Sequence, residues 1–322
     1  MSGQLYSKSN MSYNSNMPSD FIINAVKATF DTALLIGCAA IGSGYYGKVY
    51  AIKLSKPPYT AAIKIYNKSG DNEREALWYL ALKRSGIPLP EIYGTYGDGE
   101  NCALLMSLIN ASSATDTAGL SERERDRLGY EIAEIAARLH SLKGSGYGAI
   151  DDASRINGGR YSGWKDYYIA KAKDSARNIS RGAEAGLLGK KHEAVYFRAL
   201  EVIDKALDNP PYPSLIHGDL NTDNILIDKE NLCVAAVIDP ISSMWGDSEY
   251  ELFQLDCASG KEYGLLNKYA RLRPLSENYS LKSAIYAALA EGNHYYNIGK
   301  ACDDNLRLFI DNLEHELDIH SL

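Results

Sequence analysis

Three polar residues that adjoin short apolar runs constrain this 322-residue chain more than any other feature. One apolar run leads through His217-Gly218 to Asp219, a second begins directly after Asn224, and a third ends at Asp239. Runs this short, bounded by turn and acidic residues, predict short strands that carry a site and do not build a large sheet. We therefore expect the side chains of Asp219, Asn224 and Asp239 to meet at one point.

The chemistry that suits this trio is phosphoryl transfer. That reaction needs a carboxylate at the attacking hydroxyl and hard oxygen ligands for Mg²⁺ at the phosphates. Asp219 is the candidate catalytic base, and Asn224 and Asp239 are the candidate metal ligands. The alternative is that the carboxylates are ordinary turn residues, and the choice depends on what accompanies them elsewhere in the chain.

A glycine-rich run, Gly42-Ser43-Gly44-Tyr45-Tyr46-Gly47-Lys48-Val49, lies in the first third of the chain. A dinucleotide-binding fingerprint requires a helix that opens inside such a run. Here strand-like residues 49–52 follow, so the run predicts a hairpin over nucleotide phosphates or, alternatively, a hairpin without a ligand. The first alternative gives nucleotide-binding roles to Gly42, Ser43, Gly44, Gly47 and Val49.

A lysine in the next strand supports the nucleotide alternative. Lys64 lies inside an apolar run, where an unpaired cation would lose its hydration, so we expect a carboxylate partner. Glu73 and Glu75 on the following helix are both candidates, and they point to different faces because they are two positions apart. We favour Glu75. Without a ligand, Lys64 would be a strand-edge residue that reaches water.

The rest of the pattern predicts a small sheet followed by helices. Apolar runs separated by glycines predict antiparallel strands within residues 30–66, then a helix over 73–83, and the prolines at 88 and 90 lead into a further extended run at 102–106. Beyond residue 110, Ser121 and Glu124 form a capping box that begins a helix. Further helices are expected at 164–176, 194–207, 281–298 and 306–319, and short strands at 214–216, 225–227 and 234–238.

Taken together, these motifs resemble those of the protein-kinase-like superfamily, in particular its small-molecule branch of aminoglycoside phosphotransferases and fructosamine kinases. Gly218 precedes Asp219 and Pro240 follows Asp239, where protein kinases have Arg and Phe-Gly. The resemblance extends over about residues 30–255. It implies an α+β, bilobed fold with a small antiparallel-sheet N-lobe and a mostly helical C-lobe.

The same resemblance implies a division of the chain. Residues 1–20 are expected to form a flexible tail, 21–106 the nucleotide-binding N-lobe, 107–110 the hinge, and 111–322 the C-lobe with the acceptor site. The hinge is expected to read the purine of ATP or GTP through the Ser107 carbonyl and the Ile109 amide. It also implies that Lys64 binds phosphate, that Glu75 is its partner, and that the family's aspartate after Gly-Asp-Pro corresponds to Glu251 here.

The implied reaction is transfer of a γ-phosphate, with Mg²⁺, to a hydroxyl of a small acceptor. An aminoglycoside or similar cationic antibiotic is the first candidate acceptor. A ketosamine of the fructosamine type is the second, although such kinases usually have Trp where Asn221 stands. A nucleotide-binding pseudokinase is the third hypothesis, and the presence of Lys64, Asp219, Asn224 and Asp239 argues against it.

Composition excludes several other classes of protein. The net charge of −7 has the wrong sign for a protein that binds nucleic acid or anionic lipid. The longest mostly apolar run, residues 33–41, is about half of the roughly 20 residues that a membrane helix needs. No targeting segment is evident, and the five widely spaced cysteines fit a reducing cytoplasm.

The predicted last helix carries an acidic stripe made of Asp304, Asp311, Glu314 and Asp318, with only Arg307 to balance it. The stripe is either a solvated face of an acidic protein or a lining of the acceptor cleft that attracts a polyamine.

Overall fold

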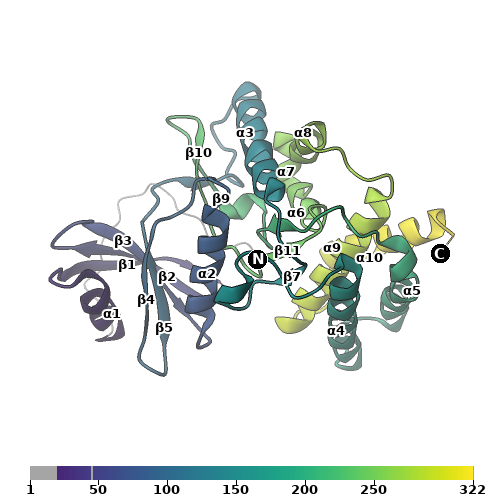
Figure 1. The fold of residues 1–322 in the computed structure, drawn as a ribbon, viewed down its shortest axis with the longest axis horizontal. Coiled ribbons are helices and arrows are strands. Elements are labelled where there is room, and N and C mark those ends of the chain that lie inside the picture. Colours follow the sequence, from purple (N-terminus) through teal and green to yellow (C-terminus); the bar gives the residue numbers. More distant parts are fainter. Residues whose placement is uncertain (1–19, 45, 322) are drawn as a thin grey trace.

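The computed structural model describes residues 20–44 and 46–321. The predicted tail therefore lies outside the described residues except for Asp20, as does Tyr45 of the glycine-rich run. The described chain forms a small lobe built on a sheet and a larger, mostly helical lobe (Figure 1). This is the fold class that the sequence predicts.

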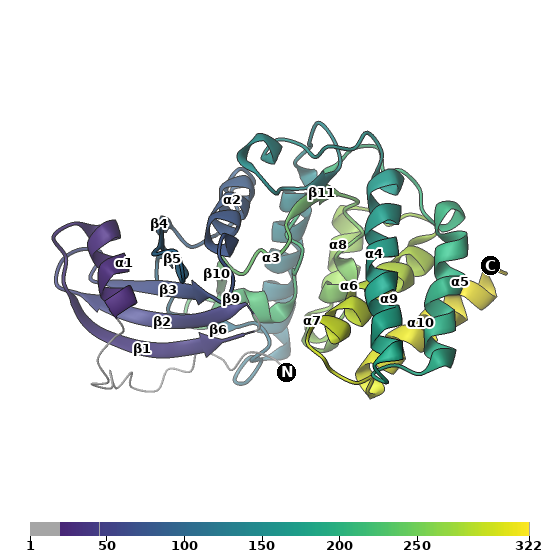
Figure 2. The same cartoon turned by 90° about the horizontal axis from the view of Figure 1, so that it is seen from below.

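The small lobe contains one antiparallel sheet of five strands in the order β1-β2-β3-β5-β4. Figure 2 shows this sheet at one end of the molecule with helix α1 beside it. Its elements are α1 (Asp20–Phe30), β1 (Leu35–Ser43), β2 (Gly47–Leu54), β3 (Thr60–Tyr66), α2 (Asp71–Lys83), β4 (Ile92–Gly97) and β5 (Cys102–Met106).

The two faces of this sheet are covered by different helices. Alternate side chains of a strand point to opposite faces, and Ile63 and Leu105 accordingly share a core with Val26 of α1. Leu104, one residue before Leu105, instead belongs to a cluster with Tyr79 of α2. The sequence pattern predicts α2, whereas α1 was not predicted.

The large lobe holds the remaining elements. They are β6 (Ser112–Ser113), α3 (Glu122–Ser141), β7 (Gly148–Ala149), η1 (Ala153–Arg155), α4 (Trp164–Glu184), α5 (Lys190–Ala206), β8 (Ser214–Ile216), η2 (Thr222–Asn224), β9 (Ile225–Asp228), β10 (Cys233–Val237), β11 (Met244–Gly246), α6 (Leu252–Leu255), α7 (Ala258–Tyr263), α8 (Leu265–Leu272), α9 (Tyr279–Asn297) and α10 (Asp304–Ile319).

Helix α3 shows how local sequence fixes an element. Ser121 accepts a hydrogen bond from the Glu124 amide while the Glu124 carboxylate accepts from the Ser121 amide, so the predicted capping box is confirmed. The apolar stripe of this helix, which includes Leu128, Ile132 and Leu139, is buried. The stripe packs against strands and helices that surround the predicted site.

Two small antiparallel sheets support the predicted site. The first has the order β10-β9-β6 and the second β7-β11-β8. In the first, Val237 pairs with Ile225, so the residues just beyond this pair lie together at one end of the hairpin. In the second, β8 leads directly into the loop that contains Asp219.

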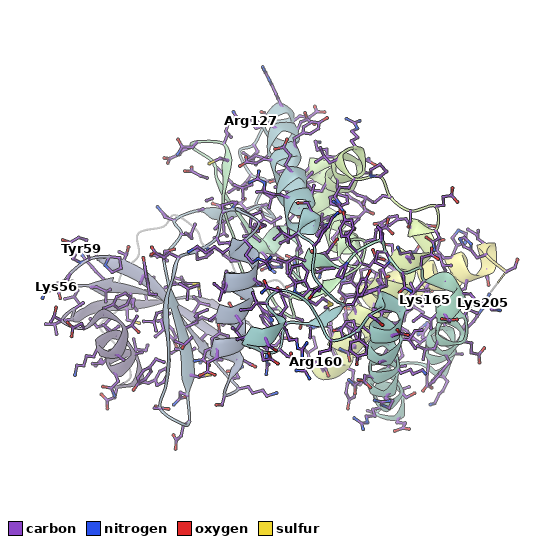
Figure 3. The ribbon with its side chains drawn as sticks, in the orientation of Figure 1. Lys56, Tyr59, Arg127, Arg160, Lys165 and Lys205 are labelled. Carbon is purple, nitrogen blue, oxygen red and sulfur yellow. The ribbon has the colours of Figure 1, made fainter. Side chains whose placement is uncertain are left out.

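The far end of the small lobe is remote from these sheets. Lys56 and Tyr59, labelled in Figure 3, lie at the tip of the β2–β3 hairpin, while Arg127 lies on α3 of the large lobe. Across the described ranges, no helix has both the length and the apolar character that would let it cross a membrane.

Candidate active site

The β9–β10 hairpin brings two of the predicted site residues together. Asn224 directly precedes β9 and Asp239 lies two residues beyond the end of β10. The Ile238 amide donates a 2.9 Å hydrogen bond to the Asn224 carbonyl, which closes this end of the hairpin. The antiparallel pair β9–β10 thus brings together Asn224 and Asp239, which are about fifteen residues apart in the sequence.

Asp219 completes the trio from the loop after β8. Its Oδ1 accepts hydrogen bonds from Asn221 Nδ2 at 2.8 Å and from Gln254 Nε2 at 2.9 Å. Its Oδ2 accepts from Asn224 Nδ2 at 2.8 Å, and the same amide group also donates to the Asp219 carbonyl. The carboxylate is therefore held in one orientation by three side-chain amides.

Burial governs the ionisation of Asp219. Loss of hydration raises its pKa to about 6, the Asn224 and Asn221 donors oppose this increase, and the negative charges of Asp239 and Glu251 add to it. A carboxyl with a raised pKa is a stronger proton acceptor when ionised than an ordinary surface aspartate. This is the property that general-base catalysis needs near neutral pH.

Gly218, which precedes Asp219, has a backbone conformation that few other residues adopt. Its φ is +94°, and a Cβ atom there would lie 2.1 Å from the Ile241 carbonyl oxygen. Gly47 in the glycine-rich hairpin has a similar steric requirement, since a Cβ atom would lie 2.0 Å from the Ile65 carbonyl oxygen of β3. The glycine at position 47 is thus required by strand pairing, whether or not a phosphate lies above the hairpin.

Lys64 joins the small lobe to this site. Its Nζ lies 2.8 Å from Glu75 Oε2, and it also contacts Asp239 Oδ1. Desolvation lowers the pKa of Lys64, but the charges of Glu75 and Asp239 more than offset this and hold it above its ordinary value. Glu75 is 2% exposed, whereas Glu73 is exposed. Lys64 therefore pairs both with its predicted partner and with the candidate metal ligand Asp239.

A cleft between the lobes adjoins this ion pair. Six of the predicted residues line it, namely Val49, Lys64, Glu75, Ser107, Ile109 and Asp239. Ser107 donates its amide to the Glu91 carbonyl and accepts from the Glu91 amide with its hydroxyl. No residue in the described ranges donates to the Ser107 carbonyl, which leaves this oxygen available to a ligand. Gly42, Ser43, Gly44 and Gly47 form the neighbouring hairpin and do not contribute to the described lining.

The donor atoms of the trio fit a magnesium ion. Asp239 and Asn224 offer a carboxylate and an amide oxygen, the hard ligands that Mg²⁺ prefers. The Asp239 side chain is 37% exposed, so it is open to a ligand in the cleft. When bound, the ion would neutralise charge on the nucleotide phosphates. In the described part of the chain, no group of three or more His, Cys, Asp or Glu residues forms a separate metal site.

Glu251 fixes the loop that presents Asp219. Its carboxylate accepts from the Gly218 amide at 2.7 Å, the His217 amide at 3.1 Å and His140 Nε2 at 2.8 Å. Burial opposes its ionisation most strongly, but the hydrogen bond and charge of His140, together with His217 and the Gly218 amide, hold its pKa below the ordinary value. Glu251 therefore holds this loop, although the family implied by the resemblance usually has aspartate near this position.

Comparison with known proteins now identifies the family. The model of the Phosphotransferase enzyme family (APH) matches residues 37–255, which is more than half of the chain and includes every predicted site residue. The chain belongs to this family. It is accordingly a small-molecule kinase.

Named relatives of this kinase include proteins with two kinds of acceptor. Protein-ribulosamine 3-kinase, chloroplastic, from Arabidopsis thaliana is 25% identical over 198 residues, which cover 60% of this chain and 58% of that protein. A thermostable mutant of aminoglycoside phosphotransferase APH(4)-Ia, in ternary complex with ADP and hygromycin B, superposes with a TM-score of 0.69 at 16% identity over 92% of this chain and 97% of that one.

A third relative is a putative fructosamine-3-kinase from Haemophilus somnus 129PT. It superposes on this kinase with a TM-score of 0.70 at 19% identity, over 92% of this chain and 97% of that one. At these identities, the two solved structures establish the fold of the kinase and do not decide its acceptor.

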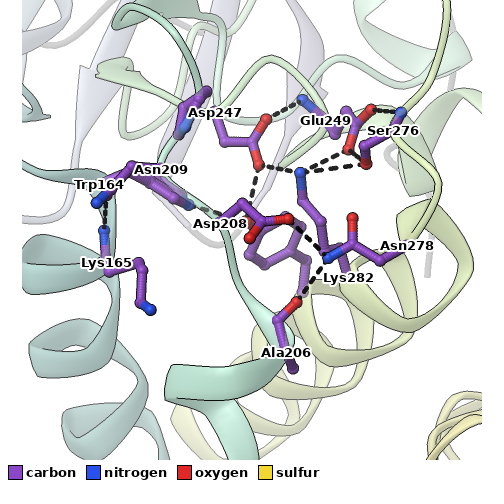
Figure 4. Close-up of polar contacts among 12 residues, drawn as sticks. Trp164, Lys165, Ala206, Asp208, Asn209, Asp247, Glu249, Ser276, Asn278 and Lys282 are labelled. Carbon is purple, nitrogen blue, oxygen red and sulfur yellow. Dashed lines mark hydrogen bonds and ion pairs between the residues drawn. The ribbon is translucent and has the colours of Figure 1, made fainter. Parts of the chain in front are cut away.

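A buried charge cluster anchors α9 of the kinase behind the site. Lys282 Nζ lies 2.7 Å from Asp247 Oδ2 and 2.6 Å from Glu249 Oε2 (Figure 4). Ser276 donates its amide and hydroxyl to Glu249, and the Tyr286 hydroxyl donates to Asp247. Since each buried charge has an opposite charge and further hydrogen bonds, the cluster meets the condition under which buried ions are tolerated.

The acidic stripe on α10 has more counter-charges than its own helix supplies. Glu314 and Asp318 pair with Lys191 and Arg198 of α5, at 4.0 and 2.6 Å, while Asp304 pairs with Arg307. The expectation that Arg307 alone balances the stripe is therefore corrected. The stripe faces α5 and solvent, whereas Phe309, on the other flank of α10, packs on Phe253 of α6.

Several residues around the site were not predicted. Gln254 and Asn221 contact Asp219, Tyr79 accepts a hydrogen bond from the Asp239 amide, and His140 supports Glu251. For Gln254 a signal existed in the sequence, because it is the one polar residue in the run Leu252-Phe253-Gln254-Leu255. His140 gave no such signal, since its partner is 111 residues away.

Proposed function

We propose that this kinase transfers the γ-phosphate of ATP or GTP, in the presence of Mg²⁺, to a hydroxyl group of an aminoglycoside or a similar cationic small molecule. One observation supports the phosphate-transfer part of this proposal: Asp219, Asn224 and Asp239 lie together beside the Lys64–Glu75 pair. In this proposal Lys64 and the glycine hairpin bind phosphates, and the Ser107 carbonyl and Ile109 amide bind the purine. Asn224 and Asp239 hold the metal.

Asp219 is the proposed base. Its carboxylate would orient the acceptor hydroxyl and accept its proton as the oxygen attacks the γ-phosphorus. His217 does not suit this role, because burial lowers its pKa and its ring Nδ1 already accepts a hydrogen bond from the Asp219 amide. It braces the loop from behind.

A second carboxylate near Asp219 favours a cationic acceptor. Burial, together with the negative charge of Asp219, raises the pKa of Glu291 on α9 to about 7. An ammonium group in this position would favour the ionised form of both carboxylates. The α10 stripe gives no support to a cationic acceptor, because Glu314 and Asp318 pair with α5.

A ketosamine acceptor is the second candidate, supported by the ribulosamine and fructosamine kinases among the relatives. Asn221 argues against it, because the Asn221 side chain caps η2 and contacts Asp219 where ketosamine kinases usually have Trp. A pseudokinase is the third, and it would bind nucleotide without transferring phosphate.

One experiment tests all three candidates. Purified protein, Mg²⁺ and ATP or GTP labelled at the γ-phosphate are incubated with a panel of aminoglycosides and of fructosamine and ribulosamine derivatives, and phosphorylated products are identified by mass spectrometry. Asp219→Asn is the matched control. Phosphorylation of ketosamines alone would reject the cationic-antibiotic acceptor, and nucleotide binding without transfer to any acceptor would reject the kinase reaction proposed for this chain.

A further inference from the structure

Gln254 is a polar residue whose side chain is hydrogen-bonded to one site carboxylate. It lies in the short helix α6, between Phe253 and Leu255, which are both buried. Within the described ranges its side chain makes a single hydrogen bond, from Nε2 to Asp219 Oδ1 at 2.9 Å. Its Oε1 is buried and has no partner among the described residues. Such an arrangement costs free energy, so a general structural role does not explain the residue.

The hydrogen bonds to Asp219 are unequally divided between its two oxygens. Oδ1 accepts from two donors, Asn221 and Gln254, and Oδ2 accepts from one, Asn224. Each oxygen of an ionised carboxylate has about two acceptor positions. Both acceptor positions of Oδ1 are therefore occupied, and Oδ2 retains one free acceptor position.

We propose that Gln254 is a positioning residue for phosphoryl transfer: together with Asn221 it fills Oδ1 of Asp219 and leaves Oδ2 to receive the proton of the acceptor hydroxyl. This inference rests on the proposed function. In the step itself, the acceptor O–H bond breaks and its proton goes to Oδ2. The acceptor oxygen bonds to the γ-phosphorus, and the bond from that phosphorus to the bridging oxygen breaks, with its electron pair leaving on the nucleoside diphosphate.

Gln254 is a better test of this division than Asn221. Asn221 Oδ1 also accepts hydrogen bonds from the amides of Asp223 and Asn224, so its substitution would disturb the loop itself. The Gln254 side chain has no second hydrogen bond to lose among the described residues. Without its donor, Oδ1 regains a free position, and the two oxygens compete for the acceptor hydroxyl in different geometries.

The experiment uses the full-length chain with Gln254→Met, which keeps the length of the side chain and removes the donor. A bound acceptor hydroxyl has a fixed position, whereas water can follow a reoriented carboxylate. We therefore expect kcat for transfer to fall about tenfold, with KM for nucleotide and acceptor within about twofold, and a smaller fall in nucleotide hydrolysis without acceptor. The ratio of transfer to hydrolysis should fall accordingly. Gln254→Leu, which also lacks a donor and adds no charge beside Asp219, should behave in the same way and replaces the Met variant if that variant does not fold.

Phe253→Leu is the matched control from the same helix. It weakens the packing on Phe309 without touching Asp219, so it should lower Tm and leave kcat and the ratio of transfer to hydrolysis unchanged. Equal losses of transfer and hydrolysis in Gln254→Met, or losses that Phe253→Leu reproduces, would overturn the proposal and leave Gln254 with a packing role. An unchanged kcat would overturn it as well.

A spectroscopic measurement separates this inference from the proposed function. The infrared carboxylate stretch of Asp219, isolated as the difference between wild type and Asp219→Asn, should shift in Gln254→Met because one hydrogen bond to Oδ1 is lost. The measurement needs no acceptor. A wild type that phosphorylates nothing would count against the proposed function alone, whereas an unshifted band would overturn the role of Gln254.

Discussion

Two carboxylate-rich regions of this kinase differ in how their charges are stabilised. Around the loop that precedes β9, the carboxylates of Asp219 and Glu251 each accept three hydrogen bonds or more and are largely shielded from water. On α10, Asp318 has one ion-pair partner and a side chain that is 63% exposed. Buried charges with several partners are costly to change, whereas exposed pairs contribute little. The contrast teaches that the residues around Asp219 and Glu251 are constrained, whereas the α10 surface is free to vary.

The largest expected effect comes from the centre of the constrained region. Asp219→Asn should lower kcat by about 10² to 10⁴, the range for loss of a general base. Nucleotide affinity should survive, because the proposed nucleotide contacts of Lys64, Ser107 and Ile109 are untouched. Steady-state kinetics measures kcat, and a fluorescent-nucleotide titration measures the nucleotide affinity. Full turnover in this variant would remove Asp219 from the role of base.

Glu251→Gln should lower the free energy of unfolding by about 3 kcal/mol at pH 7, because a buried, hydrogen-bonded charge loses its interactions. The pKa of Glu251 is held below its ordinary value of 4.5, so its stabilisation is complete above that pH and is lost as the pH falls through the folded-state pKa. The difference between wild type and variant should therefore narrow below about pH 4.5.

Urea unfolding at several pH values measures this difference. Asp318→Asn is the control from α10 and should change the free energy of unfolding by less than about 1 kcal/mol. A difference between wild type and Glu251→Gln that grows as the pH falls would contradict the sign of the linkage.

The third test compares two acids on α2. Glu75→Gln should lower kcat/KM about tenfold, since Lys64 loses its charged partner at 2.8 Å. Glu73→Gln should stay within about twofold, because an exposed carboxylate contributes little and Glu73 lies on another face of the same helix. A larger loss of kcat/KM in Glu73→Gln than in Glu75→Gln would mean that the Lys64–Glu75 pair does not support catalysis.

The smallest effect is expected on α10. The triple variant Asp311→Asn, Glu314→Gln, Asp318→Asn should lower the free energy of unfolding by about 1 kcal/mol or less, and by less still at high salt, since exposed pairs are screened. KM for nucleotide and acceptor should not change. A severalfold rise in acceptor KM, greater at low salt, would show that this face does steer a cationic acceptor and would break the contrast between the two regions.

Local patterns explain why much of the fold could be predicted. The capping box at Ser121, the strand at 102–106 and the strand at 214–216 are each encoded within a few residues. Helix α1 was not predicted, because its residues directly follow a polar tail. It is stabilised by burial against β4 and other strands of the five-stranded sheet. Burial of that kind depends on residues distant in the sequence.

The site shows the same division. Asp219 and Asn224 are five residues apart and Lys64 and Glu75 eleven, so their proximity follows from one loop and from one strand with its following helix. Gln254 and His140 could not be placed, because their partners are 35 and 111 residues away. The true neighbours of the α10 stripe were hidden for the same reason, since Arg198 lies 120 residues before Asp318.

The contact between Lys64 and Asp239 has a consequence for the order in which the molecule assembles. It closes a loop of 175 residues, while each lobe closes its own part of the site over a much shorter span. Because the entropy lost on closing a loop rises with its length, and non-local contacts form late, two separately folded half-sites are expected to precede the complete one. The proposed phosphate-binding half and the proposed metal-binding half would then form before they meet, and docking of the two lobes would complete the site.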